Sequence, residues 1–145
     1  SSSFFHIPYI SAFMSWTIFL LVLFSVSAHS QNTADAPIKN GISKAKQQDY
    51  KGAIQDFSKE IKLHPDNFKA YMYRAYAKEA MQDYKGAIQD YNEAILFKPD
   101  SSGIFYDRAL ARYSFGDLKN ACLDWKKSVE LGLPDADYML KHYCK

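Results

Sequence analysis

The chain contains the segment DYKGAIQDF at residues 49–57 and repeats it as DYKGAIQDY at residues 83–91, displaced by 34 positions (83 minus 49). Only the last of these nine residues differs, and Pro65 and Pro99 follow the two copies at the same offset. A more divergent third copy occupies residues 116–125. Self-similarity at a fixed period predicts an array of stacked supersecondary units.

Each unit has the pattern of two helices. In the second unit we predict one helix over residues 71–81, a turn at residues 82–83 and another helix over residues 84–97. Pro99 would end the second helix, because proline lacks an amide hydrogen and clashes with the preceding turn. Small residues recur where paired helices must approach to about 8–10 Å. They are Gly41, Ala75 and Ala109 at one position, and Ala53, Ala87 and Ala121 at another.

These motifs resemble the tetratricopeptide repeat (TPR) family over about residues 34–133. The resemblance implies an all-α superhelix of three helical hairpins, at about residues 34–67, 68–101 and 102–133, with a capping helix at residues 134–145. The first unit departs from the family pattern, because Pro37 replaces the usual large aromatic residue and Glu60 replaces a small one. We therefore expect a linker over residues 31–37 and a first helix that begins late, near Ile38 or Lys39, so that the three repeats occupy residues 38–133.

The first 30 residues contain no Asp, Glu, Lys or Arg, and an apolar run at residues 16–24 is followed by small residues. This layout predicts a secretory signal over residues 1–30, cut after Ala28 or Ser30, with Met14 as a candidate start. The protein would then be exported to a periplasm, a cell envelope or the medium. The alternative is an uncleaved membrane anchor, since residues 4–28 are almost long enough to cross a bilayer.

The resemblance implies that the first helix of each hairpin lines a concave groove for an extended peptide or a partner helix. The groove positions carried over are Ile38, Ile42 and Ala45, then Lys69, Met72, Tyr76 and Glu79, then Tyr106, Leu110 and Tyr113. Apart from Lys69 at the edge, each set is spaced i, i+4, i+7 and shares one helix face. Tyrosine suits recognition because it combines a large contact area with a polar tip. The alternative is that these side chains pack between adjacent repeats.

One known binding mode of the family is not expected. Some members clamp the terminal carboxylate of a chaperone tail with cationic and amide side chains. The corresponding positions in this chain are Ile38, Ile42, Gly103 and Asp107, which offer no cation.

Charged residues also recur with the repeat. Arg74 to Asp90 and Arg108 to Asp124 both span 16 residues, from the first to the second helix of a hairpin. We predict that each pair forms an ion pair that holds its hairpin together, with anion binding by the arginines as the alternative.

The two cysteines are Cys122 and Cys144. In an oxidising compartment we expect them to form a disulfide that closes a loop of 21 intervening residues and stabilises the array by about 3 kcal/mol. The alternative is a pair of buried free thiols. With only His142 nearby, the cysteines do not make a set of four metal ligands.

Composition narrows the function. The net charge of +2, with both signs interspersed, gives no basic patch for nucleic acid. No nucleophile stands beside a base, and the glycines are too scattered for a phosphate-binding loop, so we expect neither an enzyme nor a cofactor. The prediction is a scaffold or adaptor that binds a protein or peptide partner, and that meets a membrane only through a retained N-terminal segment. The alternatives are a self-associating structural homo-oligomer and an accessory domain of an envelope complex.

Overall fold

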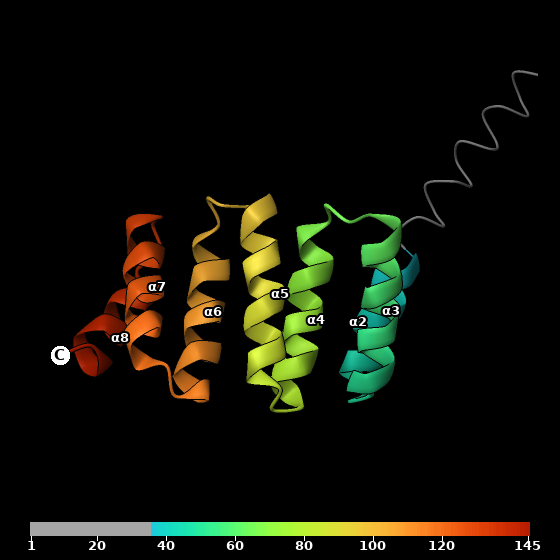
Figure 1. Cartoon of the computed structure of the whole chain (residues 1–145), viewed down its shortest axis with the longest axis horizontal. Coiled ribbons are helices and arrows are strands. Elements are labelled where there is room, and N and C mark those ends of the chain that lie inside the picture. Colours follow the sequence, from blue (N-terminus) through green and yellow to red (C-terminus); the bar gives the residue numbers. More distant parts are fainter. Residues whose placement is uncertain (1–35) are drawn as a thin grey trace, which may run out of the picture. The chain divides into compact units, whose positions relative to one another are not determined.

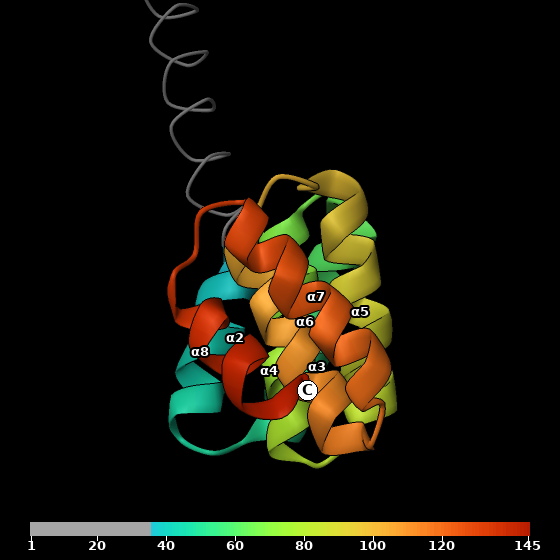
Figure 2. The ribbon, with the colours of Figure 1, turned by 90° about the vertical axis from the view of Figure 1, so that its left-hand side faces the viewer.

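A computed structural model describes residues 36–145, and within this range every regular element is an α-helix. The helices are α2 (Ala36–Lys46), α3 (Tyr50–Leu63), α4 (Phe68–Ala80), α5 (Tyr84–Phe97), α6 (Ser102–Phe115), α7 (Leu118–Glu130) and α8 (Asp135–Tyr143). Figure 1 shows α3 to α8 side by side in chain order, with α2 overlapping α3 in this view, and Figure 2 views the array end-on with α7 and α8 nearest the reader. The all-α array of helical hairpins predicted from the repeat is confirmed. The expected signal segment and residues 31–35 of the expected linker lie outside the described residues.

The second hairpin lies close to its predicted bounds. Helix α5 begins and ends at the predicted residues, Tyr84 and Phe97. Helix α4 begins at Phe68, three residues earlier than predicted, with Asn67 as its N-cap. The Tyr71 hydroxyl donates a hydrogen bond of 2.9 Å to the Pro65 carbonyl, and so ties the first turns of α4 to the preceding loop.

The predicted late start of the first helix is wrong. Helix α2 begins at Ala36 and includes Pro37 in its first turn. A proline is tolerated there because the amide hydrogen that it lacks would have no partner inside the helix. The last two residues of the expected linker are therefore helical.

The turn inside each hairpin is built in the same way. Asp49, Asp83 and Asp117 cap the second helices, and each carboxylate accepts a hydrogen bond from the amide three residues later, at 2.9, 2.9 and 3.2 Å. The residue before each aspartate has a positive φ of 63°, 63° and 94° at Gln48, Gln82 and Gly116. The left-handed residue ends one helix so that the aspartate can start the next.

Small residues let the paired helices approach, as predicted. Ala53, Ala87 and Ala121 are fully buried, and each shares a core cluster with the large buried side chain of its own helix, Phe57, Tyr91 or Trp125. In the first hairpin a methyl group at Gly41 would lie 2.5 Å from Cε1 of Phe57, so only glycine lets α2 pack this closely on α3. Within residues 36–145, no helix is both long and apolar enough to cross a membrane.

Candidate partner-binding groove

Two bidentate ion pairs connect the helices of the second and third hairpins. Arg74 on α4 donates to both carboxylate oxygens of Asp90 on α5, at 2.9 and 2.7 Å. Arg108 on α6 donates to Asp124 on α7 in the same way, at 2.9 and 2.6 Å. Both aspartates are 3% exposed, so each charge depends on its partners for solvation.

Each buried aspartate has a second cation that the sequence analysis missed. Lys78 lies 2.8 Å from Asp90, and Arg112 lies 2.7 Å from Asp124. Lys44 takes the equivalent place in the first hairpin, 2.7 Å from Asp56. The signal was present in the sequence, because Lys44, Lys78 and Arg112 are themselves 34 positions apart.

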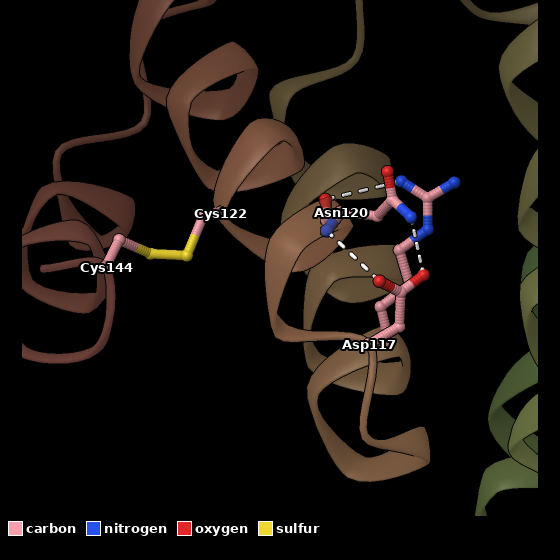
Figure 3. The surroundings of a disulfide bond; sticks show 5 residues. Asp117, Asn120, Cys122 and Cys144 are labelled. Carbon is pink, nitrogen blue, oxygen red and sulfur yellow. Dashed lines mark hydrogen bonds between the residues drawn. A yellow bond between two sulfur atoms is a disulfide. The ribbon is translucent and has the colours of Figure 1, made fainter.

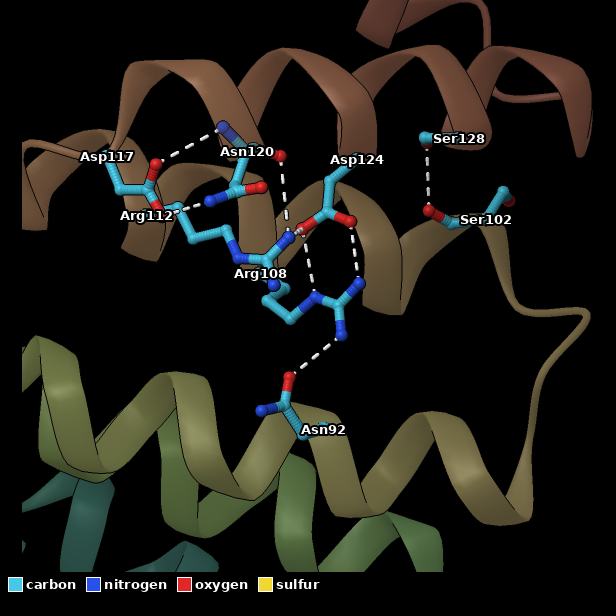
Figure 4. Close-up of polar contacts among 8 residues, drawn as sticks. All are labelled: Asn92, Ser102, Arg108, Arg112, Asp117, Asn120, Asp124 and Ser128. Atoms are coloured by element: carbon cyan, nitrogen blue, oxygen red, sulfur yellow. Dashed lines mark hydrogen bonds and ion pairs between the residues drawn. The ribbon is translucent and has the colours of Figure 1, made fainter.

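The arginines also link neighbouring hairpins. The third nitrogen of Arg74 donates to the Ser58 hydroxyl at 3.1 Å, and that of Arg108 donates to the Asn92 amide oxygen at 2.8 Å. Figure 4 shows Arg108 between Asp124 and Asn92, with Arg112 on the other side of the carboxylate. Because these donors are engaged within the protein, the contacts favour a structural role over anion binding.

At the C-terminal end, Cys122 on α7 and Cys144 after α8 form a disulfide, with their Cα atoms 5.8 Å apart (Figure 3). Helix α8 packs on the same side of α7, where its Ala136 lies in one cluster with the fully buried Trp125. The disulfide therefore fixes the terminal helix over the core of the third hairpin. Within residues 36–145, no group of three or more His, Cys, Asp or Glu side chains is placed to hold a metal ion.

A pocket of about 270 Å³ opens between α2 and α4, and we refer to it as the groove pocket. It is lined by Ile42, Ala45, Lys46, Tyr50, Phe57, Tyr73, Tyr76 and Ala77. Ile42, Ala45 and Tyr76 are groove positions predicted from the sequence. Tyr73 was missed because the predicted set on this helix began at Met72 and followed the i, i+4, i+7 spacing. Tyr73 is the next residue and lies in the adjacent row of the helix surface.

The other predicted groove residues do not line this pocket. Ile38 packs beside Phe57, and Met72 packs against the core cluster that contains Tyr91. Tyr106 and Leu110 pack against the cluster of Trp125. These four residues therefore pack against the core, which agrees with the alternative that the predicted groove residues pack between repeats. Lys69 is exposed.

Tyr113 lies at the other end of the row. It is 43% exposed, and its ring centroid lies 5.1 Å from that of Tyr143 and 6.0 Å from that of Trp125. Tyr113 therefore belongs to the aromatic cluster under the capping helix, with one edge exposed.

Beside the groove pocket, two carboxyl groups are held by tyrosine hydroxyls. The Tyr76 hydroxyl donates to Asp107 on α6, and the Tyr91 hydroxyl donates to Glu79 at 2.6 Å. The two tyrosine rings meet edge to face, with centroids 6.0 Å apart. We call Glu79 and Asp107 the carboxyl pair. Burial raises the pKa of Asp107, and burial together with the Asp107 charge raises the pKa of Glu79.

The raised pKa values predict the sign of a pH dependence. A carboxyl group whose pKa is higher in the folded than in the unfolded state stabilises the fold below its ordinary pKa, and this contribution is lost as pH rises through the folded pKa. The variant Glu79→Gln/Asp107→Asn should therefore gain stability relative to the wild type between pH 3.5 and pH 7. Urea unfolding at both pH values measures this difference.

Asp100→Asn is the control, because hydrogen bonding to Lys98 lowers the pKa of Asp100. This substitution should show no relative gain at pH 7. An equal response of the two variants would contradict the assignment of the shift to the carboxyl pair.

Several solved structures share this arrangement of helices. The second TPR domain of human RPAP3, in complex with the HSP70 peptide SGPTIEEVD, is 28% identical to this chain with a TM-score of 0.72, over 77% of this chain and 95% of that one. The first TPR domain of Spaghetti (RPAP3), bound to the HSP90 peptide SRMEEVD, is 24% identical with a TM-score of 0.72, over 77% and 90%. Residues 36–145 therefore have the fold of a TPR domain. PcrH, in complex with the chaperone-binding region of PopD, has a TM-score of 0.73 at 16% identity, over 79% and 92% of the two chains.

Comparisons by sequence give a different result. No protein-family profile matches the chain, and no curated protein matches it. The TPR fold is thus supported by the 34-residue period and by the helix packing.

Proposed function

We propose that this TPR domain is a protein-interaction module that binds a segment of a partner protein over α2, α4 and α6. The observation that carries this proposal is the groove pocket. It is a largely apolar cavity between α2 and α4, the first helices of the first two hairpins, and its Tyr76 remains 40% exposed. Aromatic side chains around such a cavity are typical of sites that take the anchor residue of a partner. Three solved neighbours, RPAP3, Spaghetti (RPAP3) and PcrH, are complexes with peptides or partner regions.

Filling the groove pocket tests this function. Ala45 lines the pocket, so Ala45→Phe should occupy its volume and reduce partner capture at least tenfold, while the helical array remains folded. The experiment is affinity capture from the native source on the immobilised full chain, with circular dichroism to confirm folding.

The matched control is Leu96→Phe. Leu96 is 72% exposed on the second helix of its hairpin, outside the pocket, so this variant should capture the same proteins as the wild type. If Ala45→Phe captures the same proteins as well, then binding does not use the pocket and the proposal fails.

We further propose that the protein is exported. The uncharged first 30 residues support this proposal, and so does the disulfide, because paired cysteines persist in oxidising compartments. Mass analysis of the N-terminus of the native protein decides the question. A chain beginning after Ala28 or Ser30 would support export by a cleaved signal, whereas a retained segment would favour a tethered protein.

A further inference from the structure

The surroundings of the groove pocket are asymmetric in charge. The pocket wall is apolar or aromatic apart from Lys46, which comes from α2. On the opposite side, Tyr76 of α4 is both a pocket wall and the hydroxyl donor to Asp107 of α6. Asp107 is therefore bonded directly to a residue of the pocket wall, and the Tyr91 ring that holds Glu79 lies against that residue, with ring centroids 6.0 Å apart.

The carboxyl pair differs from the three buried aspartates that recur with the repeat. Asp56, Asp90 and Asp124 are each paired with a Lys or Arg within 2.8 Å. In residues 36–145, neither Glu79 nor Asp107 has a cation within ion-pair distance, and their hydrogen bonds come from tyrosine hydroxyls. Because these two partly desolvated carboxylates have no countercharge, they favour a ligand that carries a positive charge.

The spacing of side chains along an extended peptide further limits which ligands fit. In an extended peptide, side chains i and i+2 point to the same face and lie roughly 7 Å apart. This separation is close to the length of a tyrosine side chain, and Tyr76 both lines the pocket and donates to Asp107. An extended segment can therefore place one side chain in the pocket and the second next one on the carboxyl pair.

We propose, on the basis of the function proposed above, that the partner segment is extended and cationic, with an apolar residue in the groove pocket and a Lys or Arg two residues away on Glu79 and Asp107. This preference is opposite to that of the RPAP3 neighbours, whose bound peptides end in EEVD. An acidic terminus would meet like charges here, and like charges across an interface reduce affinity and exclude wrong partners.

The test is a selection from a random library of 12-residue peptides displayed on phage. The full chain is immobilised as the wild type, as Ala45→Phe and as Glu79→Gln/Asp107→Asn, whose amide oxygens still accept from the tyrosine hydroxyls. We expect the wild type to enrich an apolar residue followed or preceded by Lys or Arg at a separation of two. A synthetic peptide with this motif should bind about tenfold more tightly than its Arg→Glu version, a difference of about 1.4 kcal/mol.

The variants separate the two levels of the proposal. Enrichment that disappears on Ala45→Phe, and that keeps the apolar residue but loses the cation on the double amide variant, supports the cationic segment. Apolar enrichment without a cation, a cation preference that persists on the double variant, or a separation of three or four residues overturns it and leaves the binding function standing. Failure to enrich any peptide on the wild type over Ala45→Phe overturns the binding function as well. The single variants Glu79→Gln and Asp107→Asn serve if the double variant does not fold.

Discussion

Replacing Asp124 with alanine is expected to lower the free energy of unfolding by about 3–5 kcal/mol, the usual cost of removing one partner from a buried ion pair. Asp124 is 3% exposed and holds two guanidinium groups, those of Arg108 and Arg112. Both cations would remain partly buried without the Asp124 carboxylate, and Arg108 would keep Asn92 on the preceding hairpin as its hydrogen-bond partner. The loss should affect the whole array, because Arg108 connects the third hairpin to the second.

Urea unfolding followed by circular dichroism measures this effect. The control is Asp137→Ala, which removes a surface ion pair with Lys141 and should cost no more than about 0.5 kcal/mol. Changing Arg108 and Arg112 to leucine and methionine together with Asp124→Leu should recover much of the stability, since replacing all members of a buried ionic cluster by apolar side chains is often neutral. A loss for Asp124→Ala no larger than that of the control would show that the ion pairs carry little of the stability.

The repeat explains how much of this structure was predictable. Equivalent residues of stacked repeats meet equivalent neighbours, so the helix pairing and the places of the turns follow from the 34-residue period. The aspartate caps of these turns were not predicted. The Arg74 and Arg108 contacts to Asp90 and Asp124 were predicted on the same basis, and the structure places these residues in direct contact. The second cations Lys78 and Arg112, and the equivalent Lys44 beside Asp56, were overlooked because these three residues vary in type although they share one position.

Features that break the repeat were harder to predict. Glu60 stands where the later repeats have Ala94 and Ser128, and it is 2% exposed. Its carboxylate lies 2.9 Å from His64 Nδ1 and accepts a hydrogen bond of 2.9 Å from the Asn67 side chain. A large acid is accommodated there because these two polar side chains of the following loop reach it. Such a local compensation leaves no periodic signal.

The groove pocket was likewise only partly predictable. Family positions gave Ile42 and Tyr76, but the pocket also needs Tyr73 from the adjacent row of α4 and Tyr50 from the start of α3. Which of two neighbouring rows faces a cavity depends on the crossing of α2 and α4, which residue spacing alone does not give. The carboxyl pair depends on how α6 lies beside α4, because Tyr76 of α4 has to reach Asp107 of the next hairpin.

Removing the disulfide is expected to destabilise the domain by about 3 kcal/mol, because the unfolded chain regains the conformational freedom of a loop of about 20 residues. In Cys122→Ser/Cys144→Ser, α8 should also lose its covalent attachment to α7. Its remaining contacts include Ala136 in the Trp125 cluster and the Tyr143 ring beside Tyr113. In the variant, the amide hydrogens of α8 should exchange faster than in the wild type. Those of α4 and α5, which lie between the first and third hairpins, should exchange at nearly the same rate as in the wild type.

Hydrogen exchange and urea unfolding, with and without dithiothreitol, distinguish loss of the covalent bond from loss of packing around the two sulfur atoms. Reduction should lower the stability of the wild type toward that of the serine variant and leave the variant unchanged. A variant that is much less stable than the reduced wild type would assign the effect to the serine side chains. If reduction left both stability and α8 exchange unchanged, noncovalent packing on Trp125 alone would hold the capping helix, and the disulfide would contribute nothing to the integrity of the array.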